Sequence, residues 1–107
     1  METVAFRMTL KPGMREEYER RHREIWPELA DALRAAGIRD YWIFLDESTG
    51  QLFASYKRTD THTTDALPTL PVMRKWWDYM AGLMETRAER GDSAPAAVPL
   101  TPVFHLP

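Results

Sequence analysis

The sequence predicts an α+β domain in which two helices cover one face of a four-stranded antiparallel sheet. Short segments alternate apolar and polar residues with the period of two that is typical of strands, and two longer segments repeat apolar residues at helical spacing. In chain order these segments give β-α-β-β-α-β, a recurring motif with both helices on one face of the sheet. We expect strands at 4–10, 38–46, 52–57 and 103–106, and helices at 14–36 and 72–90.

The first strand and the first helix are bounded by glycine and proline. Apolar residues occupy every second position of 4–10, and the Lys-Pro-Gly sequence at 11–13 ends this strand. Gly37 is a typical residue to follow the C-terminus of the helix at 14–36. Pro27 lies inside that helix, lacks an amide hydrogen and crowds the preceding turn. We therefore predict one long helix with a kink near its middle.

The first helix carries a titratable side chain on its apolar face. At 100° per residue, Tyr18, His22, Ile25 and Leu29 lie within about 60° of one another. Charged side chains point the opposite way and form a solvated, salt-bridged face. An imidazole titrates near neutral pH and can both accept and donate a proton. His22 is therefore either a core histidine bonded to Tyr18 or the backbone, or an acid/base group in the wall of a polar pocket.

The next two strands form a predicted hairpin. The Asp-Glu-Ser-Thr-Gly sequence at 46–50 has turn chemistry and separates 38–46 from 52–57. Alternation in the first of these strands places Arg39, Tyr41, Ile43 and Leu45 on one face, and Asp40, Trp42 and Phe44 on the other. Tyr41 either presents its hydroxyl to a pocket or packs as a core aromatic residue.

The C-terminal half supplies a second helix and a short last strand. A threonine-rich connector at 59–71, with room for one helical turn, precedes the helix at 72–90, whose apolar stripe contains Met73, Trp77, Met80 and Met84. The Gly-Asp-Ser sequence at 91–93 breaks this helix. Prolines on both sides confine the strand at 103–106 to a few residues.

The tandem Trp76 and Trp77 cannot point at the same part of the core, because neighbours on a helix diverge by about 100°. Indole rings can pack on the apolar face of a sugar while their N–H groups reach its hydroxyls. In the alternative interpretation, one of the two residues lies in the core and the other lies in a dimer contact or on the surface.

Composition excludes several classes of function. The 107 residues suffice for one domain, 1–107, and the formal net charge of −2 offers no basic excess to nucleic acid or anionic lipid. The chain contains no cysteine and no run of 18 apolar residues, and we expect no targeting segment, because its first residues lack a basic region followed by a long apolar run. His62 and His105 lack a second ligand at metal-binding spacing. We expect a cytoplasmic protein without metal that binds no nucleic acid or membrane, and a homodimer that buries the uncovered, aromatic-rich sheet face.

The stretch at 17–29, which reads EYERRHREIWPEL, resembles the hallmark helix of the L-rhamnose mutarotases. Further similar residues follow in the same order along the chain. These are Tyr41 with Ile43 and Leu45-Asp46, then Leu-Phe-Ala at 52–54, Arg-Lys-Trp-Trp-Asp-Tyr-Met at 74–80, and Phe-His-Leu-Pro at 104–107. The resemblance therefore spans essentially the whole chain.

This resemblance implies a ferredoxin-like fold assembled as a dimeric α/β barrel, and interconversion of the α and β anomers of L-rhamnose without metal or organic cofactor. It implies that His22 is the proton donor and that Tyr18, Tyr41, Trp76 and Trp77 contact the sugar. Because one fold hosts many functions, two alternatives stay open. One is a cofactor-free monooxygenase-like or ligand-binding protein of the same architecture, and the other is a non-catalytic dimerising module.

Overall fold

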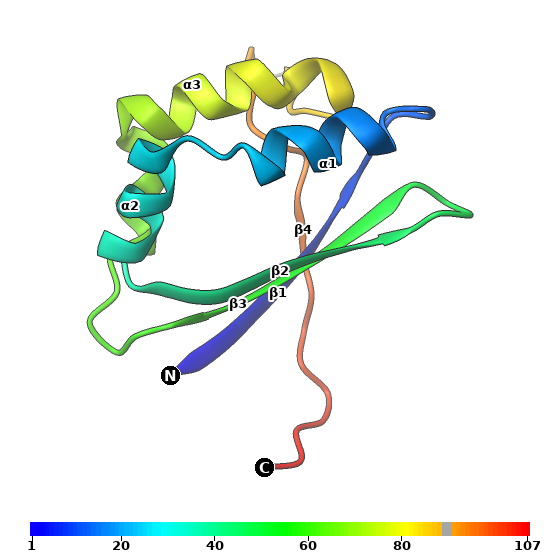
Figure 1. The fold of residues 1–107 in the computed structure, drawn as a ribbon. Helices are drawn as coiled ribbons and strands as arrows, with labels where there is room; N and C mark the ends of the chain where they lie inside the picture. Colours follow the sequence, from blue (N-terminus) through cyan, green and yellow to red (C-terminus); the bar gives the residue numbers. More distant parts are fainter. Residues whose placement is uncertain (89–90) are drawn as a thin grey trace.

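A four-stranded antiparallel sheet carries the helices on one of its faces (Figure 1). The computed structural model describes residues 1–88 and 91–107. The strand order β2-β3-β1-β4 and the position of the helices confirm the predicted ferredoxin-like α+β class. The elements are β1 (Glu2–Thr9), α1 (Arg15–Arg23), α2 (Pro27–Ala35), β2 (Ile38–Asp46), β3 (Gln51–Arg58), η1 (Thr64–Thr69), α3 (Pro71–Met80), η2 (Ala81–Leu83) and β4 (Val98–Pro99).

The prediction of one kinked helix at 14–36 is wrong, because the helix is interrupted at 24–26 and continues as a separate α2. Trp26 adopts an extended conformation (φ −62°, ψ 129°), as the residue before a proline favours, and Pro27 occupies the first turn of α2. The amide of Glu24 donates to the carbonyl of Arg20 and closes the last turn of α1. As a result α2 turns toward the sheet (Figure 1).

The β2–β3 ladder is interrupted by a bulge that the sequence did not reveal. The ladder pairs are Arg39↔Lys57 before the bulge and Trp42↔Ser55 after it. Residues 40–41 of β2 therefore lie opposite the single residue Tyr56 of β3. Asp40 takes φ +51°, a left-handed conformation that aspartate tolerates better than most residues.

Because of the bulge, part of the predicted alternation in β2 is wrong. Ile38 is buried, while Arg39 is exposed and pairs with the exposed Lys57, so the prediction that Arg39 shares a face with Tyr41 and Ile43 is wrong. Beyond the bulge the half-buried Ile43 and the exposed Phe44 alternate as predicted. An extra residue in one strand reverses the faces of all later side chains relative to the earlier ones, and a period-two pattern in the sequence does not reveal this change.

The second helix is shorter than predicted. It ends at Met80 and continues only as η2, and the chain is already extended at Met84, which forms an antiparallel bridge with Leu10. The amide of Glu85 donates to the carbonyl of Thr9 at 2.9 Å. Pairing with the end of β1 thus replaces the last turns of the predicted helix at 72–90, whose residues 89–90 lie outside the described part of the chain.

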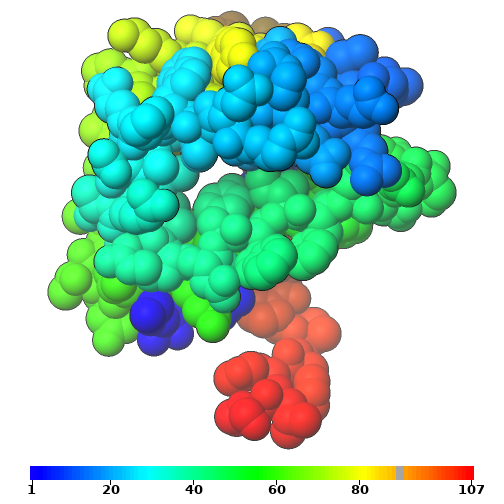
Figure 2. Space-filling model, in the orientation of Figure 1, coloured from blue at the N-terminus to red at the C-terminus, as the bar shows by residue number. Residues whose placement is uncertain are grey.

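The predicted strand at 103–106 is also wrong. The last strand is β4, which pairs with Phe6 and Arg7 of β1, and the amide of Leu100 donates to the carbonyl of Ala5. Residues 101–107 form an arm that leaves the body of the protein (Figures 1 and 2). Pro102 and Pro107 cannot donate to a ladder, which limits pairing in this arm.

The hydrophobic core fills the space between the sheet and the helices. Leu29 of α2 and Leu52 of β3 are each 1 % exposed. The core also includes a residue of η2 and continues to the end of β1. Its other members include Met8, Ala54, Met73, Trp76 and Met80. Part of this layer is open, and that opening forms the candidate site.

Candidate active site

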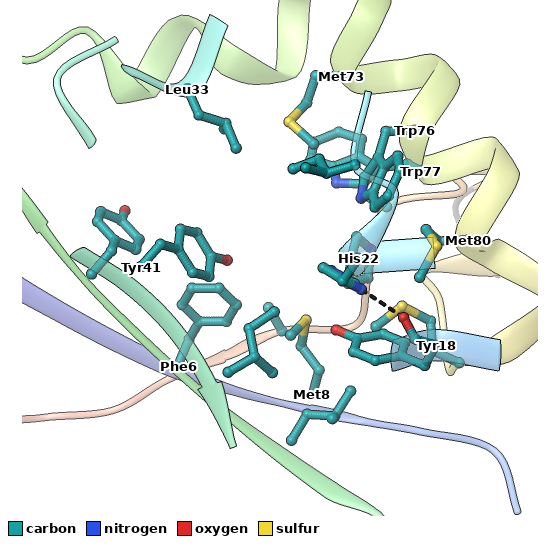
Figure 3. A pocket seen from close by; sticks show the side chains of 18 of the residues that line it. Phe6, Met8, Tyr18, His22, Leu33, Tyr41, Met73, Trp76, Trp77 and Met80 are labelled. Carbon is teal, nitrogen blue, oxygen red and sulfur yellow. Dashed lines mark hydrogen bonds between the residues drawn. The ribbon is translucent and has the colours of Figure 1, made fainter. Parts of the chain in front are cut away.

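A cavity of about 960 Å³ lies between the helices and the covered face of the sheet. Its opening is visible as a hollow between the helices and the strands in Figure 2. The residues predicted from the sequence as site residues all line it, and Figure 3 shows them around one space. They are Tyr18 and His22 of α1, Tyr41 of β2, and Trp76 and Trp77 of α3.

The imidazole of His22 is oriented within its own helix. Its Nδ1 lies 2.9 Å from the carbonyl oxygen of Tyr18 (Figure 3). A carbonyl oxygen can only accept, so Nδ1 carries a hydrogen and donates it. Nε2 makes no hydrogen bond to any residue in 1–88 or 91–107. Nε2 is therefore the ring nitrogen that can exchange a proton with a bound molecule.

Burial tunes the acidity of this imidazole. Desolvation by the surrounding side chains lowers the pKa of His22 below its usual value of 6.5, and the bond to the Tyr18 carbonyl opposes this shift. The charged form is thus less stable in the site than in water. A proton placed on Nε2 is correspondingly easier to give away.

Tyr18 packs directly beside His22. The two rings lie 4.4 Å apart between centroids, and Tyr18 is 9 % exposed. Burial raises the pKa of Tyr18 above its ordinary value of 10.0, so the phenol stays neutral over the physiological range. A neutral phenol can both donate and accept a hydrogen bond.

Trp76 belongs to the core and to the cavity at once. It is 6 % exposed and meets His22 edge-to-face at 5.4 Å and Trp26 edge-to-face at 5.1 Å. Trp77 is only half-buried, yet it also lines the cavity. The interpretation that one of these residues lies in the core is correct for Trp76, but the cavity receives both rings.

Tyr41 reaches the cavity from the opposite side, across from His22 (Figure 3). Although 40 % of its surface is exposed, desolvation raises the pKa of Tyr41, with smaller contributions from the phenols of Tyr18 and Tyr56. Its hydroxyl is therefore a neutral hydrogen-bonding group. The wall between the phenols and the imidazole is mainly apolar and includes Met8, Leu33, Ile43, Leu67, Met73 and Met80.

Charged residues on the outer side of α1 hold this helix against α3. Arg21 donates to the carbonyl of Tyr79 and lies 4.1 Å from the centroid of its ring. Glu17 accepts from both Arg20 and Arg21, and these hydrogen bonds lower the pKa of Glu17 to about 2. The ion pairs confirm the predicted salt-bridged face of α1. The contacts of Arg21 with Tyr79 join α1 to α3 and so hold His22 in place relative to Trp76.

Sequence reasoning missed three aromatic residues near the site. Phe6 and Tyr56 line the cavity from the sheet, and Trp26 supports Trp76 from the break between α1 and α2. Phe6 is only one of the apolar residues that alternate along the predicted strand at 4–10. The position of Trp26 before a proline was a usable signal, whereas the importance of Tyr56 depends on the bulge.

The remaining histidines are not brought to this cavity. His62 interacts through Nδ1 with the hydroxyl and amide of Thr64, and His105 lies in the exposed arm. No group of three or more metal-ligating side chains is found within 1–88 and 91–107. Across the same residues, no helix combines the length and hydropathy required to span a membrane.

Comparison with known proteins gives consistent matches. A family model described as L-rhamnose mutarotase matches residues 3–106. An L-rhamnose mutarotase of Paraburkholderia phytofirmans is 62 % identical over 99 % of this chain and 96 % of its own length. One from Sinorhizobium fredii is 60 % identical over 99 % of both chains. The crystal structure of an L-rhamnose mutarotase from Formosa agariphila is 37 % identical, with a TM-score of 0.89 over the whole of both chains.

Proposed function

The chain belongs to the L-rhamnose mutarotase family and is an isomerase of sugar anomers, and we propose that His22 supplies the proton as it interconverts the α and β anomers of L-rhamnose. Tyr18, Tyr41, Trp76 and Trp77 bind the sugar, and residues 1–107 act as one domain. The observation that carries this proposal is the convergence of all these side chains on one cavity, with His22 Nδ1 bonded to its own helix and Nε2 without a hydrogen bond among the described residues. A cysteine-free chain is compatible with a cytoplasmic location, which we also propose.

The chemistry requires one proton to be delivered and one to be removed. In ring opening, Nε2 of the imidazolium of His22 donates to the ring oxygen as the bond from C1 to that oxygen breaks. The proton on O1 leaves to a bound water, either directly or through a tyrosine hydroxyl that accepts it while passing its own proton to that water, and O1 becomes the aldehyde oxygen. After rotation about the C1–C2 bond the steps reverse on the other face of the carbonyl, and Nε2 takes its proton back. Acid/base assistance of this kind contributes about 10²- to 10⁴-fold in rate.

The apolar wall supports a deoxysugar as the substrate. A methyl group at C6 gains about 0.8 kcal/mol when it is buried against side chains such as Met73 and Met80. A hexose with a hydroxyl at C6 would have to place that hydroxyl in the same surroundings. The resulting preference is modest, because a hydrophobic pocket rejects an added hydroxyl by only about 10²-fold.

The direct test is saturation-transfer NMR between the anomers of L-rhamnose with and without protein. We expect catalytic amounts of the protein to accelerate exchange between the two anomeric signals. Sugar binding without faster exchange would favour the ligand-binding alternative, and neither binding nor exchange would favour the dimerising module. Either result would contradict the proposed function.

The pH dependence follows from the acidity of His22. Only the imidazolium carries a hydrogen on Nε2, and burial places its pKa below 6.5. We therefore expect kcat/KM to fall about tenfold per pH unit above that pKa and to level off below it. The measurement is the exchange rate between pH 5 and 8, about the titration range of histidine, after subtraction of the protein-free rate at each pH.

Stability should change with pH in the opposite direction. The folded-state pKa of His22 lies below the unfolded value of 6.5, so folding favours the neutral ring. This contribution is fully present above pH 6.5 and is lost as the pH falls through the folded-state pKa. A His22→Gln protein should lose this part of the pH dependence of stability.

The direction of the pH dependence of the exchange rate tests the role of His22. An exchange rate that rises with pH through the same range would make His22 the proton acceptor in ring opening.

We further propose that the protein is a homodimer that covers the free face of the sheet. Trp42 and Phe44 are 54 % and 57 % exposed on that face and stack on one another at 5.6 Å. The arm at 101–107 adds Val103 at 93 % and Phe104 at 81 % exposure. Such a collection of exposed apolar side chains is typical of a surface that binds another chain. A second copy presents the same surface, as a two-fold dimer requires.

Sedimentation velocity at micromolar concentration tests the dimer. We expect the wild type to sediment as a dimer and Trp42→Glu to shift it toward the monomer, because a charge would be buried at the contact. Asp31→Lys, on the exposed surface of α2, is the matched control and should remain dimeric. A wild-type protein that is only monomeric would contradict the proposal.

A further inference from the structure

We propose that Tyr56 is a positioning residue that holds Tyr41 in its orientation toward the sugar. This inference rests on the proposed function, in which Tyr41 contacts L-rhamnose. Neither the resemblance nor the alternation of β3 assigns a role to Tyr56. The structure brings it against Tyr41 through the bulge in β2 and into the lining of the same cavity.

The bulge is the reason that the two phenol rings meet. Asp40 and Tyr41 together lie opposite Tyr56, so two residues of β2 share one position of the ladder. Bulges of this kind bend the strand and redirect a side chain, and they are frequent beside active sites. In a regular ladder that continues from Ile38, alternation would place Trp42 on the covered face instead.

The rings form a small aromatic cluster on the covered face of the sheet. Tyr41 and Tyr56 are stacked, with centroids 5.3 Å apart and an interplanar angle of 23°. Phe6 of β1 meets both of them edge-to-face, at 6.5 Å from Tyr41 and 6.4 Å from Tyr56. The stacked and edge-to-face contacts leave Tyr41 few alternative directions.

The other contacts at the bulge are too exposed to hold Tyr41 in its orientation. The carboxylate of Asp40 accepts from Trp42 Nε1 at 2.9 Å and lies 3.7 Å from Lys57 Nζ. The side chains of Lys57 and Asp40 are 52 % and 55 % exposed, and exposed ion pairs contribute little. Tyr41 is itself 40 % exposed, and of its two ring contacts the stacked one with Tyr56 is closer than the edge-to-face one with Phe6.

The experiment measures kcat and KM for anomer exchange in Tyr56→Leu and Tyr56→Phe. We expect Tyr56→Leu to raise KM by about 2- to 10-fold, the range of an aromatic pair, with a smaller change in kcat. Tyr56→Phe keeps the ring and should stay within about twofold of the wild type. Rescue by the ring alone separates positioning from direct contact by the hydroxyl. Tyr56→Met replaces Tyr56→Leu if the latter does not fold.

A double-mutant cycle with Tyr41→Leu completes the test. If Tyr56 acts through Tyr41, the effect of Tyr56→Leu on KM should disappear when Tyr41→Leu is already present. An undiminished effect in that background, or no effect of Tyr56→Leu in the wild type, would overturn the inference. Loss of exchange in the wild-type protein would instead refute the proposed function, so the two failures are distinguishable.

Discussion

Replacement of His22 by alanine is expected to lower anomer exchange by about 10²- to 10⁴-fold, the usual contribution of a positioned acid/base group. The fold should persist, because His22 is only half-buried and its hydrogen bond is confined to α1. Saturation-transfer NMR gives the rate, and thermal unfolding of the same sample gives the stability. Loss of exchange at an unchanged Tm would exclude a purely structural role for this histidine.

Two matched variants make this test specific. His22→Gln keeps a polar side chain of similar reach but cannot deliver a proton near neutral pH, so it should be as impaired as His22→Ala. His62→Ala removes a histidine that lies outside the cavity, bonded to Thr64, and should leave the rate unchanged. Substantial exchange in both His22 variants would contradict the assignment of His22 as the proton donor.

Replacement of Trp76 by alanine is expected to lower the free energy of unfolding by about 3–5 kcal/mol. Trp76 is 6 % exposed and packs between Trp26 and His22, so its removal leaves a cavity in the core and frees the imidazole. Urea denaturation measures the change in stability. Trp76→Phe fills part of the space and should lose less.

Trp77 provides the comparison within the same helix. It is half-buried, so Trp77→Ala should lower the free energy of unfolding by clearly less than Trp76→Ala while still weakening sugar binding. Equal losses of stability in the two variants would show that Trp76 is no more a part of the core than Trp77. A Trp77→Ala protein with unchanged KM would remove Trp77 from the binding site.

The sequence predicted the architecture because the strands and helices have distinct periods. The strand at 38–46 was predicted with the bounds that β2 has, because its β-branched and aromatic residues favour a strand and the turn residues that follow mark its end. The end of the second helix was harder to predict. The apolar stripe at 72–90 keeps helical spacing past Met80, but pairing between Met84 and Leu10 is a long-range contact that no local pattern contains.

The site was partly predictable for the same reason. Tyr18 and His22 are one turn apart, so helical geometry alone places them on one face. The neighbourhood of Tyr41 was not predictable, because it depends on an extra residue in β2 that leaves no mark on the alternation of apolar residues around it. Trp26 was overlooked because its role arises only when Pro27 separates two helices that the pattern joins.

The hydrogen bond from His22 Nδ1 to the Tyr18 carbonyl separates the chemistry of the site from its selectivity. The proposed proton donor is oriented by a single helical turn, within four residues of sequence. Of the side chains proposed to contact the sugar, only Tyr18 shares α1 with His22, and the others come from β2 and α3, far away along the chain. Substitutions at Tyr41 or Trp77, neither of which stacks on His22, can therefore change the sugar preference of this enzyme while the proposed proton donor keeps its orientation.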